Sequence, residues 1–448
     1  MTGTSVKEDW LGRIDAVQEA RGHQADQVLA LWAGAVLVLM LLYICIGPNP
    51  YQHDITLDPL TGGAETSPIN RLIWLGLLGL SAPILWFRRA DLPGMALRLL
   101  PLLILFGWFA LTTRWALDPA VSTRRLILYV VNLLICIAIT IGLKDSRRLH
   151  LALAVGCAIL VAVDLASWAV MPGISMTDLG LAAIHSHKNT LGAVMLLSGF
   201  VCGAYAWSRE TWKARLFWWT VTFLSVVLLV ASQSKTSLGL FAALVSATPV
   251  IVVIMAQRRI IRYGLMVLGA LIAASLVFGW LAFCYVTAAD PWAPFAGITF
   301  TQRTDVWAFV WDEFVKRPIR GWGFGGFWDI DPSVQPSLQT DAWFAQPDAF
   351  TNEAHNGFLD LAVTTGLVGL VGSVIILFRW LGGGLALIGQ TVGGPQHQAF
   401  GAALVLGVFP LMVFGHNFME SSYFTANSIF GTVLLLLGIE IERRFIRA

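Results

Sequence analysis

One polar interval, from Arg303 to Asn356, gathers side chains that could carry out chemistry in a chain that is otherwise strongly apolar. The interval opens with Arg303, turns at Gly321-Trp322-Gly323 and closes with His355 at the start of the next apolar run. A guanidinium forms short, charge-assisted hydrogen bonds to phosphate oxygens. An imidazole titrates near neutral pH and can accept a proton from a hydroxyl group. Together they predict a reaction in which a phosphate leaving group departs and an alcohol attacks.

The composition indicates that lipid surrounds most of the chain. Hydrophobic residues make up 57% of the sequence and charged residues only 12%, and the mean hydropathy is +0.72. Soluble domains carry about twice that charged fraction. The five cysteines fall in apolar runs without metal or disulfide spacing, so we interpret them as packing residues. The net charge of +2 gives no indication of nucleic-acid binding, and we expect none.

Twelve apolar runs are long enough to cross a bilayer, and each must be helical because its backbone polar groups need partners within the segment. The runs lie at about 28–47, 71–87, 96–113, 126–143, 149–171, 190–207, 214–231, 237–256, 264–285, 357–379, 398–415 and 424–441. The sequence therefore predicts an all-α integral membrane protein of about 12 transmembrane helices. Its expected parts are an N-terminal segment (1–27), helices 1–9 (28–285), a large loop (286–352), and helices 10–12 with the C-terminus (353–448).

The basic residues predict the orientation. Nineteen of the 29 Lys and Arg residues fall on one side of the predicted spans, which places both termini in the cytoplasm and the loop 286–352 outside. The first apolar run follows a polar segment and is long enough to remain as an uncleaved anchor. The ten outer cations are Arg71, Arg114, Arg124, Arg125, Lys188, Lys235, Arg303, Lys316, Arg317 and Arg320.

Several outer cations stand at the ends of apolar runs, where burying an unpaired charge costs about 2.5–3.5 kcal/mol. Arg124 and Arg125 begin one run, and Lys188 and Lys235 lie beside two others. These positions predict a positively charged pocket for phosphates, with Arg320 as a further contributor. Asp329-Ile330-Asp331 has the form of a metal-binding pair. Because the cations already offer charge neutralisation, we expect neither a metal nor another cofactor.

Within the large loop, Trp307, Val310, Trp311 and Phe314 recur at helical spacing. Thr304 could cap this helix and Pro318 follows its end, so we expect an amphipathic helix along the membrane face. Its aromatic stripe is more typical of packing than of sugar stacking. Each of the other candidates also has a structural interpretation. His355 could be a capping residue, Arg303 a cation that flanks a helix, and Lys235 a lysine whose side chain snorkels to the membrane edge. Asn189 could cap the helix after His187-Lys188-Asn189, and His416-Asn417, before Glu420, could form structural hydrogen bonds.

The pattern Arg303…Trp307…Pro318…Gly321-Trp322-Gly323…His355-Asn356, followed by Leu359 and Gly366, resembles the shared C-terminal region of bacterial O-antigen ligases and Wzy-type polysaccharide polymerases. His187-Lys188-Asn189 is similar to an element of the exopolysaccharide-polymerase branch. Ser232-Gln233-Ser234-Lys235-Thr236 resembles another family element, with lysine where many members have arginine. Trp115…Asp118-Pro119 with Arg124 is similar to an outer-loop signature. The likeness is firmest over about 185–380.

The resemblance implies a metal-independent membrane glycosyltransferase with a GT-C-like bundle in the bacterial inner membrane. Such proteins move a glycan from an undecaprenyl-pyrophosphate carrier to an acceptor on the periplasmic face. It implies catalytic roles for His355, Arg303 and Lys235. We add, as candidate substrate-binding residues, Arg124, Arg125, His187, Lys188, Arg320, Trp307 and Asn356.

The acceptor is another lipid-linked glycan in a polymerase and lipid A–core in a ligase. The His-Lys-Asn element favours the polymerase. Membrane lipid and other polysaccharide-assembly proteins are the remaining candidate partners. Three alternative functions are a secondary transporter, a peptidoglycan glycosyltransferase of the shape, elongation, division and sporulation group, and a non-catalytic scaffold. Transporters often show two related halves, whereas the two halves of this sequence show no likeness.

Overall fold

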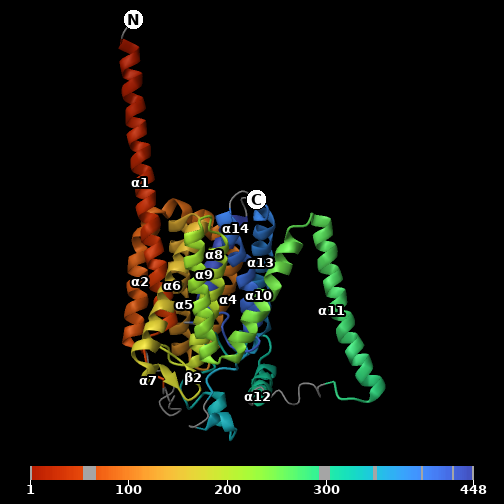
Figure 1. The fold of residues 1–448 in the computed structure, drawn as a ribbon. Helices are drawn as coiled ribbons and strands as arrows, with labels where there is room; N and C mark the ends of the chain where they lie inside the picture. The colour runs from red at the N-terminus through yellow and green to blue at the C-terminus, as the bar shows by residue number, and fades with distance from the viewer. Residues whose placement is uncertain are drawn as a thin grey trace.

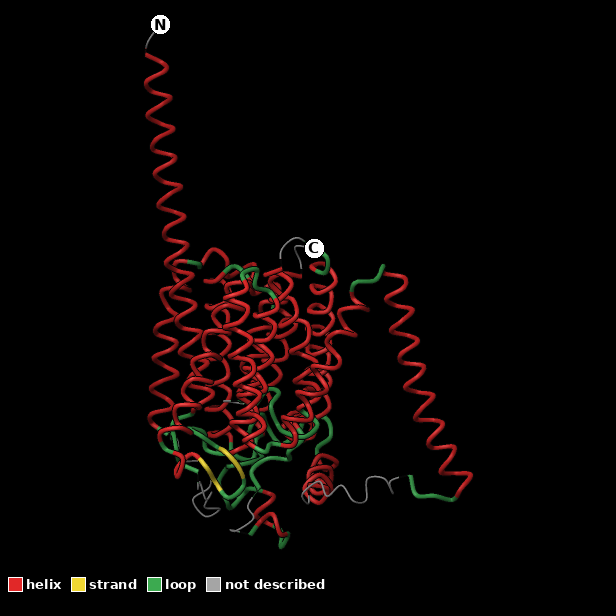
Figure 2. The backbone as a smooth tube through the Cα atoms, viewed as in Figure 1, coloured by secondary structure: helices red, strands yellow, loops and turns green. Residues whose placement is uncertain are grey.

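The computed structural model describes residues 3–53, 67–291, 303–346, 351–394, 397–425 and 428–445. It is a bundle of long helices with one short hairpin of strands (Figures 1 and 2). The helices are α1 (Gly3–Ile46), α2 (Pro68–Phe87), α3 (Leu92–Arg98), α4 (Leu100–Thr112), α5 (Pro119–Leu143), α6 (Ser146–Val170), α7 (Pro172–Ser175), α8 (Lys188–Trp207), α9 (Trp212–Ser232), α10 (Lys235–Met255), α11 (Arg259–Thr287), α12 (Arg303–Lys316), α13 (Gly357–Thr391), α14 (His397–His416) and α15 (Ile429–Phe445). The hairpin pairs β1 (Met176–Thr177) with β2 (Gly180–Leu181).

The prediction of an all-α integral membrane protein is confirmed. Within the described ranges, ten helices are long and apolar enough to cross a membrane. The segments Arg89–Arg98 and Leu100–Trp115, bent by 78° at their junction, raise the number to eleven if they form one span. The last predicted run corresponds to α15, which has 17 residues. A helix therefore lies at each of the twelve predicted positions.

The bend between α3 and α4 replaces the continuous span expected at 96–113. Pro101 lies in the first turn of α4, where its missing N–H costs no intrahelical hydrogen bond. In the middle of a continuous helix the same proline would remove one such bond. The chain therefore ends α3 at Arg98 and begins a second helix at Leu100.

Small residues allow the central helices to approach closely. A side chain added at Gly384 of α13 would lie 2.3 Å from the Leu406 oxygen, and one added at Gly407 of α14 would lie 2.5 Å from the Ile388 side chain. Close packing through glycine is a common way to join helices in lipid, where the hydrophobic effect between helices is absent. By contrast, α11 stands apart from the bundle (Figure 1).

Most of the irregular segments gather at the end of the bundle where α12 lies, and the C-terminus lies at the other end, from which α1 extends (Figures 1 and 2). The helix α12 ends before Pro318, as expected, but Thr304 lies inside its first turn and is not its N-cap. The predicted apolar stripe of α12 is not buried along its whole length: Val310 is buried, whereas Trp311 is 53% exposed. Residues 292–302 and 347–350 of the predicted loop lie outside the described residues.

The Gly321-Trp322-Gly323 turn docks on a break in α13. Gly366 has a φ of +68° within this helix, and a side chain there would lie 2.1 Å from the Ile319 oxygen. Only glycine fits such a close approach at a positive φ. Backbone hydrogen bonds join the two segments: Trp322 to Val363 (2.8 Å), Gly323 to Thr364 (2.8 Å) and Leu367 to Pro318 (2.7 Å). The turn thus fixes the loop against the helix that begins just after His355.

Candidate functional site

Arg303 and His355 meet at a carboxylate, that of Glu420. Nη2 of Arg303 donates to Oε1 of Glu420 at 3.0 Å, and Nη1 donates to the Met419 carbonyl. Nδ1 of His355 lies 2.9 Å from the other oxygen, Oε2. The first residue of α12, the residue before the N-cap of α13 and the loop after α14 are therefore joined in one network.

Glu353 completes the surroundings of His355. Its Oε1 lies 2.8 Å from the same Nδ1 atom. Ionised carboxylates only accept hydrogen bonds, so Nδ1 carries a proton that both of them share. Within the described residues, Nε2 has no hydrogen-bond partner. This leaves Nε2 as the ring atom that can exchange a proton with a substrate.

The charges around His355 shift its titration. Burial alone would lower the pKa of His355, but the hydrogen bonds and charges of Glu353 and Glu420 outweigh it and raise the pKa to about 9. Burial acts to raise the pKa of Glu420, yet His355 and Arg303 stabilise its ionised form and hold the pKa far below its usual range. At neutral pH, the arrangement is an imidazolium between carboxylates.

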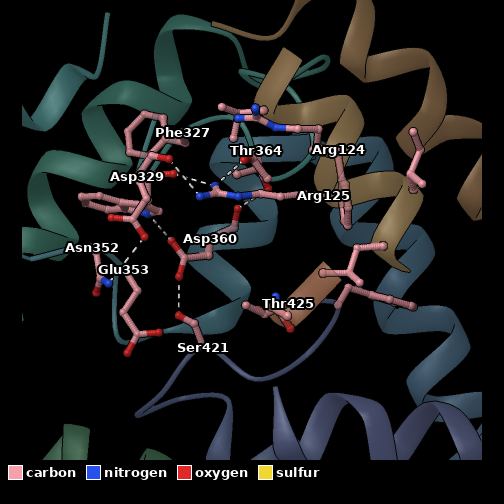
Figure 3. A pocket seen from close by; sticks show the side chains of 18 of the residues that line it. Arg124, Arg125, Phe327, Asp329, Asn352, Glu353, Asp360, Thr364, Ser421 and Thr425 are labelled. Carbon is pink, nitrogen blue, oxygen red and sulfur yellow. Dashed lines mark hydrogen bonds between the residues drawn. The ribbon is translucent and has the colours of Figure 1, made fainter. Parts of the chain in front are cut away.

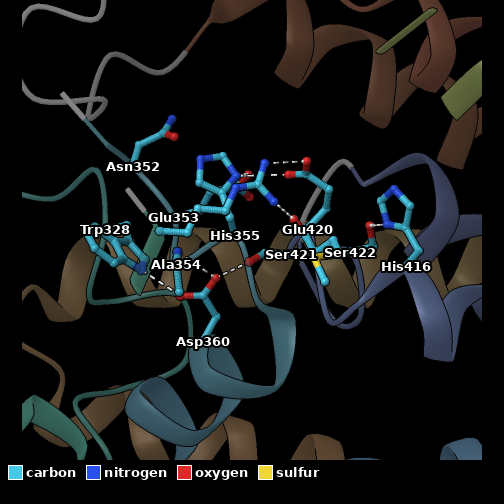
Figure 4. Close-up of polar contacts among 12 residues, drawn as sticks. Trp328, Asn352, Glu353, Ala354, His355, Asp360, His416, Glu420, Ser421 and Ser422 are labelled. Atoms are coloured by element: carbon cyan, nitrogen blue, oxygen red, sulfur yellow. Dashed lines mark hydrogen bonds and ion pairs between the residues drawn. The ribbon is translucent and has the colours of Figure 1, made fainter. Parts of the chain in front are cut away.

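Asp360, in the first turn of α13, holds the two sides of this network together. Its carboxylate accepts from the Ala354 amide (3.2 Å), the Trp328 indole N–H (2.7 Å) and the Ser421 hydroxyl (Figure 4). Ala354 immediately precedes His355, and Ser421 immediately follows Glu420. Asp360 is therefore a positioning residue for both.

Asn417 fixes the end of α14 against the start of α13. Its carbonyl accepts from the Gly357 amide at 2.9 Å, and its buried side chain accepts from the amides of Ser422 and Tyr423. The His416 ring contacts the Ser422 hydroxyl at 3.0 Å. These contacts agree with the structural alternative given above for the His416-Asn417 pair, and they place Glu420 beside His355.

Trp307 and Asn356, both candidate substrate-binding residues, contact the backbone around His355. The indole N–H of Trp307 donates to the Ala354 carbonyl at 2.9 Å. The Asn356 side chain caps α13 by accepting from the amides of Phe358 (3.1 Å) and Leu359 (3.2 Å). His355 itself has a φ of +49°, a conformation that the neighbouring contacts must hold. In this structure both residues position the histidine.

The helix that begins at the His-Lys-Asn element packs against the Ser-x-Ser-Lys-Thr element. A side chain added at Gly192 of α8 would lie 2.5 Å from Ser234, which precedes α10. His187, and not Asn189, is the N-cap of α8, accepting from the Asn189 amide at 3.1 Å. Burial and Lys188 lower the pKa of His187, while the charge of Glu420 acts in the opposite direction. His187 is thus within electrostatic range of the Glu420 network.

The two lysines of these elements differ in their contacts. Nζ of Lys188 donates to the Leu179 carbonyl in the hairpin turn at 3.1 Å. Lys235 begins α10, is exposed, and makes no ion pair in the part of the chain that the structure describes. Its charge remains available to a ligand.

Arg124 and Arg125 line a cavity of about 880 Å³ between α2, α5, the 324–329 loop, the first turns of α13 and residues 421–425 (Figure 3). Neither Arg303 nor Lys235 lines it. Arg125 is committed to the loop: its guanidinium donates to the carbonyls of Gly325 (2.6 Å), Trp328 (2.6 Å) and Asp329 (2.9 Å). Arg124 is exposed. The structure therefore separates this pair from the Arg303 network.

Arg320 is exposed and lies 5.8 Å from the Trp115 ring centroid, while its carbonyl accepts from the Trp115 indole. Arg320 does not line the cavity, and among the described residues it has no hydrogen bond or ion pair to the Glu420 network. The Asp329-Ile330-Asp331 carboxylates also diverge: Asp329 is mostly buried beside Asn352, and Asp331 is exposed and accepts from Ser333.

Glu353, Asp360 and Glu420 are parts of the site that the sequence motifs did not predict. A carboxylate two residues before a candidate histidine was a usable signal for Glu353. For Glu420, the signal was its place in the last outer loop. Donor atoms of Glu353, His355 and Glu420 lie within 4.8 Å of one another, a set that could hold a divalent cation. The guanidinium of Arg303 already supplies positive charge to this set.

The O-antigen ligase family model matches residues 220–374. No curated protein matches the chain. The matched range runs from α9 into α13 and contains Lys235, Arg303 and His355. The predicted relationship is therefore confirmed over residues 220–374, whose match supports a relationship of this chain to the O-antigen ligase and Wzy-type superfamily.

Proposed function

We propose that this polysaccharide polymerase- or ligase-type membrane glycosyltransferase moves a glycan from an undecaprenyl-pyrophosphate carrier to an acceptor hydroxyl at the periplasmic face of the inner membrane. The observation that carries the proposal is the junction of Arg303 and His355 at Glu420. It brings a cation suited to phosphate and an imidazole suited to proton transfer into one site, at the end of the bundle opposite the C-terminus. Both termini are then cytoplasmic.

His355 acts as the base. With its Nδ1–H held by Glu353 and Glu420, the neutral ring presents Nε2 to the acceptor hydroxyl. As the hydroxyl oxygen attacks the anomeric carbon, its proton passes to Nε2, and the carboxylates stabilise the imidazolium that forms. The same division of roles operates in hydrolase triads, where a carboxylate orients the histidine and balances its charge.

Arg303 and Lys235 act on the leaving group. The bond between the anomeric carbon and the phosphate oxygen breaks, and its electron pair leaves with the diphosphate, which departs as an anion and needs no proton. Positive charge fixed where this negative charge develops lowers the barrier. A single displacement of this kind inverts the anomeric carbon. In our proposal, the reaction needs no metal.

We favour a polymerase, in which the acceptor is a second lipid-linked glycan, on the strength of the His-Lys-Asn element that caps α8 near Glu420. The alternative is a ligase that transfers the glycan to lipid A–core. Product analysis of a strain lacking the protein tests both. Single repeat units accumulate if a polymerase is lost, and long chains remain on the carrier if a ligase is lost. Unchanged glycans would contradict both functions.

Complementation of that strain separates an enzyme from a scaffold. Wild-type protein should restore the product and His355→Ala should not, although it inserts in the membrane at a similar level. Asp331→Asn is a matched control, because Asp331 is exposed and its side chain hydrogen-bonds only to Ser333 among the described residues. Full restoration by His355→Ala would favour a non-catalytic assembly role.

A further inference from the structure

The cavity between α2 and α5 has the form of a site for an amphiphile. Its volume is about 880 Å³, and Arg71 from α2 is part of its lining. Arg124 from α5 also lines it (Figure 3). Both arginines are exposed, and neither makes an ion pair with any residue that the structure describes. Two uncommitted guanidinium groups at one cavity suit a phosphate, which they bind through strong charge-assisted bonds.

The apolar part of the cavity follows from helical spacing. Leu75 lies one turn after Arg71 on α2, and Ile127 and Leu128 lie one turn after Arg124 on α5, so each cation shares a helix face with an apolar side chain. Leu75 is 54% exposed and Ile127 is 58% exposed. The positive charge of the arginines near the helix ends, with exposed apolar side chains one helical turn further along, suits a lipid with an anionic headgroup.

This cavity borders the candidate active site at Glu353. That residue lines the cavity and also lies 2.8 Å from Nδ1 of His355. Figure 3 shows Arg124 and Arg125 on one side of the cavity and Glu353 and Ser421 on the other. A molecule seated on Arg71 and Arg124 therefore has its headgroup beside the wall that carries the base. Arg303 and Lys235, the proposed donor contacts, are not part of the lining.

We propose that this cavity binds the acceptor, as a second phosphate-bearing lipid whose headgroup contacts Arg71 and Arg124 and whose tail follows Leu75 and Ile127. This inference rests on the proposed function, which assigns the donor to Arg303 and Lys235 and so leaves the acceptor for this cavity. The shared chemistry is a lipid phosphate. A prenyl diphosphate and lipid A are its two sources, and binding measurements distinguish them.

The test is native mass spectrometry of the full-length protein in detergent with undecaprenyl diphosphate, lipid A or phosphatidylglycerol. We expect the wild type to bind two molecules of undecaprenyl diphosphate, and the double variant Arg71→Glu/Arg124→Glu to bind one, with affinity for the second reduced at least about tenfold. Arg114→Glu is the matched control, since Arg114 is an exposed cation in the segment before α5 that does not line the cavity. If the double variant is poorly folded, Arg71→Gln/Arg124→Gln replaces it.

Each outcome decides a point. Loss of lipid A binding instead of undecaprenyl diphosphate binding also supports the site, with lipid A as the acceptor. Unchanged binding of both lipids overturns it, and so does equal loss of phosphatidylglycerol, which indicates a groove for bulk lipid. Arg303→Ala tests the donor site separately: if this variant still binds two molecules while the cavity variant binds one, the donor assignment fails and the cavity assignment stands.

Discussion

Arg303 and His355 contact opposite oxygens of the same carboxylate, although Glu420 lies 117 residues from the first and 65 from the second along the chain. A single shared carboxylate couples the cation to the base. It fixes the direction of the guanidinium and supplies the negative charge that keeps the imidazole protonated. A change at Glu420, which contacts both, should therefore alter both phosphate binding and proton transfer.

The pH dependence of transfer should reflect His355. Its pKa is about 9, above the ordinary value near 6.5, so the neutral base is the minor form at pH 7 and its fraction rises with pH. We expect the rate of glycan transfer to rise from pH 6 towards pH 9. Glu353→Gln removes one of the negative charges that raise the pKa of His355 and should move the midpoint of the pH–rate profile to lower pH, whereas Asp331→Asn should not. A rate that falls over this range would contradict the role of His355 as a base.

Stability should change with pH in the opposite direction. Because the folded-state pKa of His355 is raised, its protonated network stabilises the fold fully below about pH 6.5, and this contribution is lost as pH rises through about 9. Thermal unfolding of the detergent-solubilised protein should show a lower midpoint at pH 9.5 than at pH 6. This difference should shrink in His355→Gln, and an unchanged difference would assign it to other groups.

Arg303→Lys should lose much more activity than its conserved charge suggests. Arginine contacts the Met419 carbonyl and the Glu420 carboxylate through two nitrogens at once, and a lysine cannot reproduce this fork. We expect transfer to fall by at least about tenfold, with reduced binding of undecaprenyl diphosphate. Full activity in the lysine variant would show that charge alone is sufficient.

Gly366→Ala should destabilise the protein without touching the charged network. The added methyl group would lie 2.1 Å from the Ile319 oxygen at a φ of +68°, and strain of this kind costs about 1–3 kcal/mol. Gly382→Ala, in the same helix with nothing within 4 Å, is the control. Thermal unfolding measures both variants, and equal midpoints would contradict the docking of the loop on α13.

Chelation tests the expectation of metal independence. The Glu353, His355 and Glu420 donors could hold a divalent cation, but in our account Arg303 and Lys235 balance the diphosphate charge. Transfer by purified protein should therefore continue in excess EDTA. Loss of activity that returns with added Mg²⁺ or Mn²⁺ would assign a metal to this cluster.

The helices could be predicted from the sequence because length and hydropathy alone decide which segments cross a membrane. Arg303 and His355 could be selected because both border the same outer interval. The role of Glu420 could not be derived in this way, because its partners are set by the packing of α13 against α14 at Asn417 and Gly357. Its place in the last outer loop indicates the side of the membrane on which Glu420 lies, but not which residues it contacts.

Arg125 illustrates a second limit. Next to Arg124 at a helix mouth, it looked like another phosphate contact, yet its donors are occupied by three carbonyls of the 325–329 segment. Adjacent helical residues point about 100° apart, so neighbouring arginines reach different surroundings. Arg124 faces the cavity, and Arg125 holds the loop that forms one of its walls.

Single-turnover transfer by purified protein in lipid nanodiscs, with donor binding measured on the same samples, tests the central claim most directly. We predict that His355→Ala retains donor binding and loses transfer by about 10²–10⁴-fold, whereas Arg303→Ala loses donor binding as well. Transfer by His355→Ala at close to the wild-type rate, with donor bound, would contradict the account.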